Sequence, residues 1–171
     1  AIEAARQEQK AGNLPRSLTF IPGADIGRPE CVTAALKEAG ASSRGAVMVV
    51  GNGFHEVRGQ TDEEMVAVFR GYRDAGIVLV FTEESALSVD DLLQTAWNTY
   101  HAGFKYLHEK SGQGLRPAFA RSPQQHGPPL PMSWNECATR AGYVRVHDVC
   151  KRSRTIYPYP PKRGANPAIR V

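Results

Sequence analysis

Paired cysteines, long apolar runs and signal-peptide features are all missing from this sequence. The three cysteines, Cys31, Cys137 and Cys150, form no CxxC pair, so neither a zinc site nor a disulfide framework is supported. No apolar run approaches the roughly 20 residues that cross a bilayer, and no basic segment leads into an apolar one. We therefore expect reduced thiols in a cytoplasmic protein that has no membrane partner.

Several well-known catalytic motifs are also missing. The sequence contains no GxxxxGK[ST], no GxGxxG and no GxSxG, which argues against a phosphate loop, the usual dinucleotide fingerprint and the ordinary hydrolase elbow. His101 and His108 lie seven residues apart, but no third ligand accompanies them. We therefore expect no metal site.

The composition that remains is that of one globular domain. The 171 residues are 42% hydrophobic and 22% charged, which suits a packed core and excludes a disordered chain. The net charge is +4, and basic residues are concentrated in residues 140–171. Because this tail carries no nucleic-acid-binding motif, we favour a solvated face, and binding of nucleic acid through this tail stays open as the less favoured alternative.

Alternating helical and strand periods indicate an α/β fold. The continuous apolar runs 46–50 and 77–81 are typical of parallel strands covered on both faces by helices. Thr61 with Glu64, and Ser133 with Glu136, are capping boxes that begin helices. The expected order is helix 2–11, strand 17–21, helix 29–39, strand 46–50, helix 61–76, strand 77–81, helix 88–110, loop 117–131, helix 133–142, strand 143–149, loop 157–167 and strand 168–171.

Ligands of parallel α/β sheets bind beyond the carboxyl ends of the strands, so the residues that follow each strand are the first candidates. Asp25 follows the first predicted strand, and two roles stay open for it. Its carboxylate can accept a hydrogen bond from a base or ribose, or it can cap the helix at Pro29.

A glycine-rich turn follows the second predicted strand. Gly51 and Gly53 allow close backbone approach, and Phe54 can cover an aromatic or sulfur-bearing ligand. His55 can act as a general base, with Glu56 as a second titratable group at the rim of the cleft. The alternative is a structural turn with a solvated histidine.

Glu83 and Glu84 follow the third predicted strand. Adjacent strand residues point to opposite faces, so we expect one carboxylate to face the cleft and position a substrate. On the predicted helix 88–110, Trp97, Tyr100 and His101 share overlapping faces. Aromatic residues at this spacing form a core more often than a substrate pocket, and both interpretations stay open.

Taken together, these segments resemble the C-terminal part of a class I S-adenosylmethionine-dependent methyltransferase. The resemblance is carried by SLTFIPGADIG, AVMVVGNGFHEVR, the helix 61–76, IVLVFTEES and SWNECATRAGYVRVHDV, in this order. It implies a Rossmann-like, mostly parallel sheet with flanking helices and an antiparallel last strand. It also implies S-adenosylmethionine as cofactor and a small-molecule methyl acceptor.

The resemblance also implies roles for the residues at the strand ends. Asp25 and Ile26 would contact adenine, and His55 with Glu56 would be catalytic. Further cofactor and substrate contacts would come from Gly51, Asn52, Gly53, Phe54, Glu83, Trp97, Tyr100 and His101.

The glycine-rich first strand of that family, and the acid that ends its second strand, are not in these 171 residues. We therefore expect an incomplete domain over 1–171, inactive alone and stabilised by a missing N-terminal segment or by a homo-oligomer partner. The alternative is a non-catalytic α/β accessory or structural module of a multidomain protein.

Overall fold

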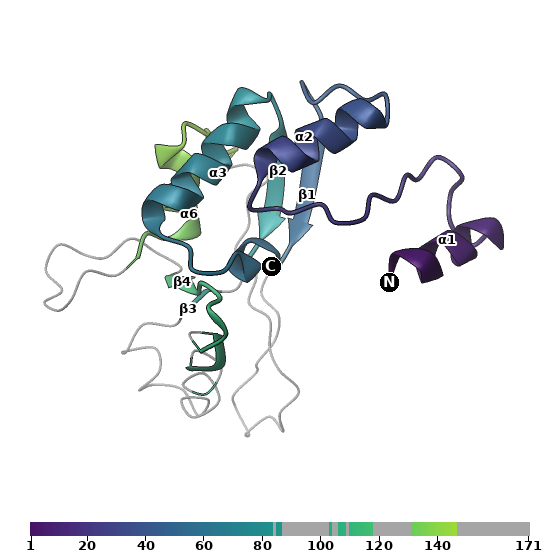
Figure 1. The fold of residues 1–171 in the computed structure, drawn as a ribbon. Helices are drawn as coiled ribbons and strands as arrows, with labels where there is room; N and C mark the ends of the chain where they lie inside the picture. The colour runs from purple at the N-terminus through teal and green to yellow at the C-terminus, as the bar shows by residue number, and fades with distance from the viewer. Residues whose placement is uncertain (84, 87–102, 104–105, 109, 118–130, 147–171) are drawn as a thin grey trace, which may run out of the picture.

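The computed structural model of the chain describes residues 1–83, 85–86, 103, 106–108, 110–117 and 131–146. Two parallel strands, β1 (Val47–Gly51) and β2 (Val78–Thr82), form the central sheet. Figure 1 shows helices α2 (Pro29–Glu38), α3 (Asp62–Asp74) and α6 (Trp134–Arg140) gathered around these strands. The chain is therefore a mixed α/β structure with a small parallel sheet.

The two faces of this sheet differ in their cover. Met48, Val50, Leu79 and Phe81 belong to the apolar core or pack against it. On the other face, Val47 pairs with Val78 and Val49 with Val80, and all four are more than half exposed. The expected cover of helices on both faces is therefore wrong for the part of the chain that is described, where one face is bare.

Helix α3 forms the centre of the core. Its predicted capping box is confirmed: Thr61 Oγ1 accepts from the backbone N–H of Glu64 at 3.2 Å, and Glu64 Oε2 accepts from that of Thr61 at 2.7 Å. The apolar positions of this helix point to one side. They are Met65, Val66, Val68, Phe69 and Tyr72, all buried. Packing of this stripe fixes the helix on the covered face of the sheet that β1 and β2 form.

The other two core helices also begin where the sequence predicts. Helix α2 starts at Pro29, and its ring lies so close to Gly71 of α3 that a Cβ built there would be 2.8 Å from Pro29 Cγ. Helix α6 begins with the predicted capping box of Ser133 and Glu136 and buries Trp134. Both helices thus reach α3 through specific close contacts.

Helix α1 (Ile2–Lys10) is predicted correctly but contributes no buried residue. Figure 1 shows it apart from the sheet, joined by an extended segment. The predicted strand 17–21 is wrong, because no strand forms there. The backbone carbonyl of Leu18 accepts from Gln9 at 2.8 Å and that of Phe20 from Arg6 at 3.4 Å, so side chains of α1 take the place of a neighbouring strand.

The predicted strand 143–149 is also wrong over its described residues, 143–146. The backbone N–H of Tyr143 donates to the carbonyl of Ala138 at 3.0 Å and so ends α6. Val144 and Val146 are exposed. The N–H of Tyr143 therefore closes the end of the helix and is not available for pairing with a neighbouring strand.

Two short parallel strands, β3 (Ser85–Ala86) and β4 (Arg116–Pro117), were not predicted. Parts of the predicted helix 88–110 are helical, at residues 103, 106–108 and 110. The rest of that helix, most of loop 117–131, and the predictions beyond residue 146 lie outside the described residues. No helix in the described ranges has the length and apolar character needed to cross a membrane.

Candidate functional site

The loop after α1 and the turn after β1 meet at the carboxyl end of the sheet. A Cβ built on Gly53 would lie 3.5 Å from Ile26 Cδ1, and one built on Gly27 would lie 3.3 Å from Val57 Cγ1. The Tyr72 hydroxyl donates to the carbonyl of Ile26 at 2.8 Å and fixes this loop to α3. Burial raises the pKa of Tyr72 well above its ordinary value, so its hydroxyl stays a donor.

Of the two predicted roles of Asp25, the helix cap is wrong, and the contact with a ligand stays a prediction. Its Oδ1 accepts from the backbone N–H of Gly27 at 2.8 Å, which makes a local turn. The N-cap of α2 is Arg28, and no side chain caps it. Asp25 is exposed, and its Oδ2 retains acceptor capacity toward a ligand.

The glycine-rich turn continues β1 directly. The backbone N–H of Asn52 donates to the carbonyl of Thr82 at 2.8 Å, and Asn52 itself has a left-handed φ of 51°. Nothing lies within 4 Å of a Cβ built on Gly51. The turn is therefore open on one side, where it could take a ligand close to the backbone.

Phe54 lies in the core and does not line an open cleft. Its side chain is fully buried, with its ring centroid 4.9 Å from that of Phe69 and 5.5 Å from that of Phe81, both edge to face. Such pairs stabilise a core beyond simple apolar burial. The predicted role of Phe54 as a cover for a ligand therefore has no support in this geometry.

Glu83 is bound to the turn that follows β1. Its Oε1 accepts from the backbone N–H groups of Gly53 at 2.7 Å and Phe54 at 2.5 Å. Its Oε2 accepts from the backbone N–H of His55 at 3.4 Å and lies 2.9 Å from the Nδ1 atom of the same residue. With 1% of its side chain exposed, Glu83 joins the ends of β1 and β2, and its predicted contact with a substrate has no support in this geometry.

His55 is buried between two carboxylates. Its Nε2 lies 3.4 Å from Glu56 Oε1, on the side opposite Glu83, and its ring centroid is 5.6 Å from that of His108. Seven per cent of the His55 side chain is exposed, against 53% of that of Glu56. Of the two predicted catalytic residues, Glu56 is thus the accessible one.

The segment 111–114 packs against the turn that carries His55 and Glu56. Gly114 donates its backbone N–H to the carbonyl of His55 at 3.0 Å, and Gly59 donates to the carbonyl of Gly112 at 2.8 Å. Gln113 Nε2 donates to Glu56 Oε2. A segment more than fifty residues further along the chain therefore holds the 3₁₀ turn η1 (Phe54–Glu56) in place.

Arg116 is a buried residue that the sequence analysis did not single out. Its guanidinium donates to Gln60 Oε1 at 2.8 Å, to the carbonyls of Thr61 at 3.0 Å and Met132 at 3.1 Å, and to Asp62 Oδ1. The Trp134 ring lies 5.3 Å below it. With these donors used, Arg116 is a structural residue, and no local motif marks it.

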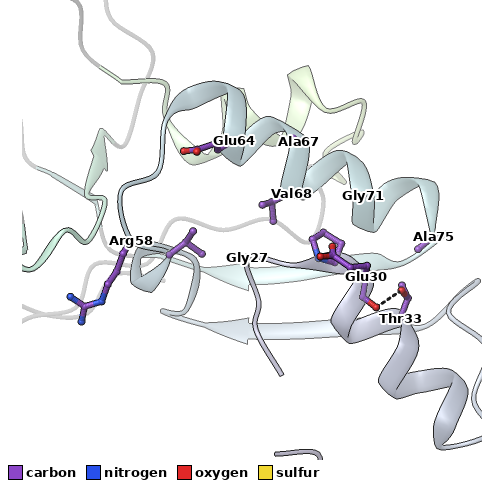
Figure 2. Close-up of a pocket in the computed structure, with 11 residues that line it drawn as sticks. Gly27, Glu30, Thr33, Arg58, Glu64, Ala67, Val68, Gly71 and Ala75 are labelled. Atoms are coloured by element: carbon purple, nitrogen blue, oxygen red, sulfur yellow. Dashed lines mark hydrogen bonds between the residues drawn. The ribbon is translucent and has the colours of Figure 1, made fainter. Parts of the chain in front are cut away.

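A separate open pocket of about 640 Å³ lies between α2 and α3. Figure 2 shows Ala67, Gly71 and Ala75 of α3 on one side and Glu30 and Thr33 of α2 on the other. It also touches Gly27 and Val57 near the strand-end loops. Neither His55 nor Glu56 lines it, so it is distinct from the cluster of titratable groups.

The structure thus brings together Asp25, Ile26, Gly53, His55 and Glu56 near one end of the sheet. Trp97, Tyr100 and His101, the predicted substrate contacts, lie outside the described residues. Within the described ranges, no group of three or more His, Cys, Asp or Glu side chains could hold a metal ion. Comparisons with family models, with curated proteins and with solved structures found no match to this chain.

Proposed function

We propose that the chain takes part in S-adenosylmethionine-dependent methyl transfer to a small-molecule acceptor, as the C-terminal portion of a Rossmann-like catalytic domain. The observation that carries this proposal is the contact between the Asp25–Ile26 loop and the Gly51–Gly53 turn at the carboxyl end of β1. This is the place where parallel α/β sheets bind their ligands.

The residues at this place suit an adenosine group. Asp25 offers an acceptor for an amino group, and Ile26 offers an apolar surface beside it. The open side of Gly51 allows a ligand to approach the backbone. Phe54 does not belong to this set, because it is fully buried.

The cofactor would supply an electrophilic methyl group, and the chain would position the acceptor and take its proton. Glu56 is the exposed carboxylate near the turn, and it would accept that proton, with His55 directly behind it. Orientation of the acceptor next to the methyl group supplies much of the rate enhancement in such a transfer.

Calorimetric titration with S-adenosylmethionine tests the proposal. The sample is a longer protein in which this chain is extended at its N-terminus by the residues that the upstream coding sequence encodes. We expect binding, and we expect Asp25→Ala to weaken it about tenfold or more through loss of a charged acceptor. Asp74→Ala is the matched control, because Asp74 is an exposed carboxylate paired with Arg73 on the far end of α3.

Absence of binding in that longer chain would overturn the proposal. The alternative, a non-catalytic α/β module, would then replace it. The burial of Phe54 and Glu83 favours that alternative, because both predicted ligand contacts are used for internal packing and hydrogen bonding.

A further inference from the structure

The carboxylate of Glu83 has four nitrogen atoms around it, and three of them are backbone N–H groups. Backbone N–H groups can only donate, so both oxygens of Glu83 must act as acceptors toward Gly53, Phe54 and His55. Backbone N–H donors bond most strongly to an ionised carboxylate, which only accepts and has no proton to give to Nδ1. The fourth contact, to His55 Nδ1 at 2.9 Å, is therefore an N–H that donates to Glu83.

We infer that Glu83 is a positioning residue that holds His55 as the tautomer protonated on Nδ1. The other ring nitrogen, Nε2, is then the one that exchanges a proton. It faces Glu56 Oε1 at 3.4 Å, and among the described residues the charged and titratable groups around the ring are Glu83, Glu56 and His108. The side chains of Glu83, His55 and Glu56 thus form a row of contacts from the buried end of β2 to an exposed carboxylate.

This arrangement also explains why the turn after β1 has its observed shape. Glu83 accepts from the backbone of the residues just before His55 as well as from its ring, so the same carboxylate fixes both the main chain and the side chain. The ring cannot rotate away without breaking a contact inside a site where 1% of the Glu83 side chain is exposed.

A role of these three side chains in proton transfer rests on the proposed function. The assignment of the His55 tautomer does not rest on it. A proton released by the methyl acceptor would go to Glu56, and from Glu56 Oε1 it would pass to the lone pair of His55 Nε2. No other group changes its charge in that step.

Long-range proton–nitrogen correlation spectra of the whole chain, labelled with ¹⁵N, test the inference without any ligand. At a pH at which the His55 ring is neutral, we expect a protonated-type signal from Nδ1 and an unprotonated-type signal from Nε2. In Glu83→Gln, the amide NH₂ can face the ring and donate to Nδ1, so we expect the two nitrogens to exchange their types.

Glu56→Gln is the matched control, because it changes the carboxylate on the Nε2 side and leaves the contact to Glu83 in place. We expect it to keep the proton on Nδ1. The inference is wrong if the unaltered chain carries the proton on Nε2, a result that needs no variant to fold. It is also wrong if a folded Glu83→Gln keeps the tautomer on Nδ1. Neither result depends on whether S-adenosylmethionine binds.

Discussion

Two cysteines of the described residues occupy very different surroundings. Cys137 on α6 is fully buried, and this burial raises the pKa of its thiol to about 11. Cys31 on α2 is partly exposed. Since the thiolate is the reactive form of cysteine, the two side chains should differ strongly in their reactivity.

We predict that iodoacetamide at pH 8 modifies Cys31 and leaves Cys137 unmodified in the folded chain. The Cys137 thiol keeps its proton until the pH rises toward 11, and no solvent reaches it before the chain opens. Peptide mass spectrometry after a short reaction measures both sites, and a urea-denatured sample serves as the control in which both react. Equal rates in the folded chain would contradict the burial of Cys137.

The residue-scale roles of Glu83 and Arg116 show where sequence reasoning stops. The place of Glu83 after a strand marks it as a candidate, but its hydrogen-bond partners lie 28 to 30 residues away and the sequence does not show them. Arg116 contacts residues up to 56 positions distant. No spacing rule identifies such partners, because they come together only when the strands and helices pack.

At the scale of elements, the contact between α2 and α3 is close enough to exclude a side chain at Gly71. Alanine in place of glycine inside a helix normally stabilises it by about 1 kcal/mol. Here, however, the new Cβ would lie 2.8 Å from Cγ and 2.9 Å from Cβ of Pro29, and a proline ring has little freedom to move.

We predict that Gly71→Ala lowers the free energy of unfolding by about 1 to 3 kcal/mol, because overpacking outweighs helix propensity. In a Pro29→Gly background, which removes both of these ring atoms, the same change should be neutral or stabilising. Urea denaturation of the four proteins measures both values as a double-mutant cycle. A Gly71→Ala variant as stable as its parent in both backgrounds would show that the helices are not in contact at this point.

Elements with strong local signals were predicted well. Both capping boxes and both apolar strand runs are confirmed to within one or two residues, because each depends on neighbours along the chain. The strand expected over 17–21 failed for a different reason. A strand needs a partner strand, and there the carbonyls of Leu18 and Phe20 accept from side chains of α1.

At the scale of the whole molecule, the described residues cover the sheet on one face only. The register of β1 and β2 puts Val47 beside Val78 and Val49 beside Val80, which makes a continuous apolar patch. Val49 is 76% exposed. Continuous exposed apolar patches bind hydrophobic probes, unlike single exposed apolar residues, which are common on any surface.

We predict that the chain binds a hydrophobic fluorescent dye such as anilinonaphthalene sulfonate, and that Val49→Thr with Val80→Thr lowers the dye fluorescence at least twofold. Threonine keeps the β-branched shape that suits a strand, so the fold should be retained. Val144→Thr is the matched control, since Val144 is exposed and belongs to neither strand. Equal fluorescence from the double variant and its parent would mean that another surface binds the dye.

One structural consequence concerns the stretch between Pro117 and Pro131. Arg116 on its near side and Met132 on its far side both bond to Asp62, through the guanidinium and the backbone N–H. The two ends are thus held together by one carboxylate in the first turn of α3. Because loop-closure entropy grows slowly with length, a clasp of this kind can keep its geometry over a wide range of lengths of the chain that it closes.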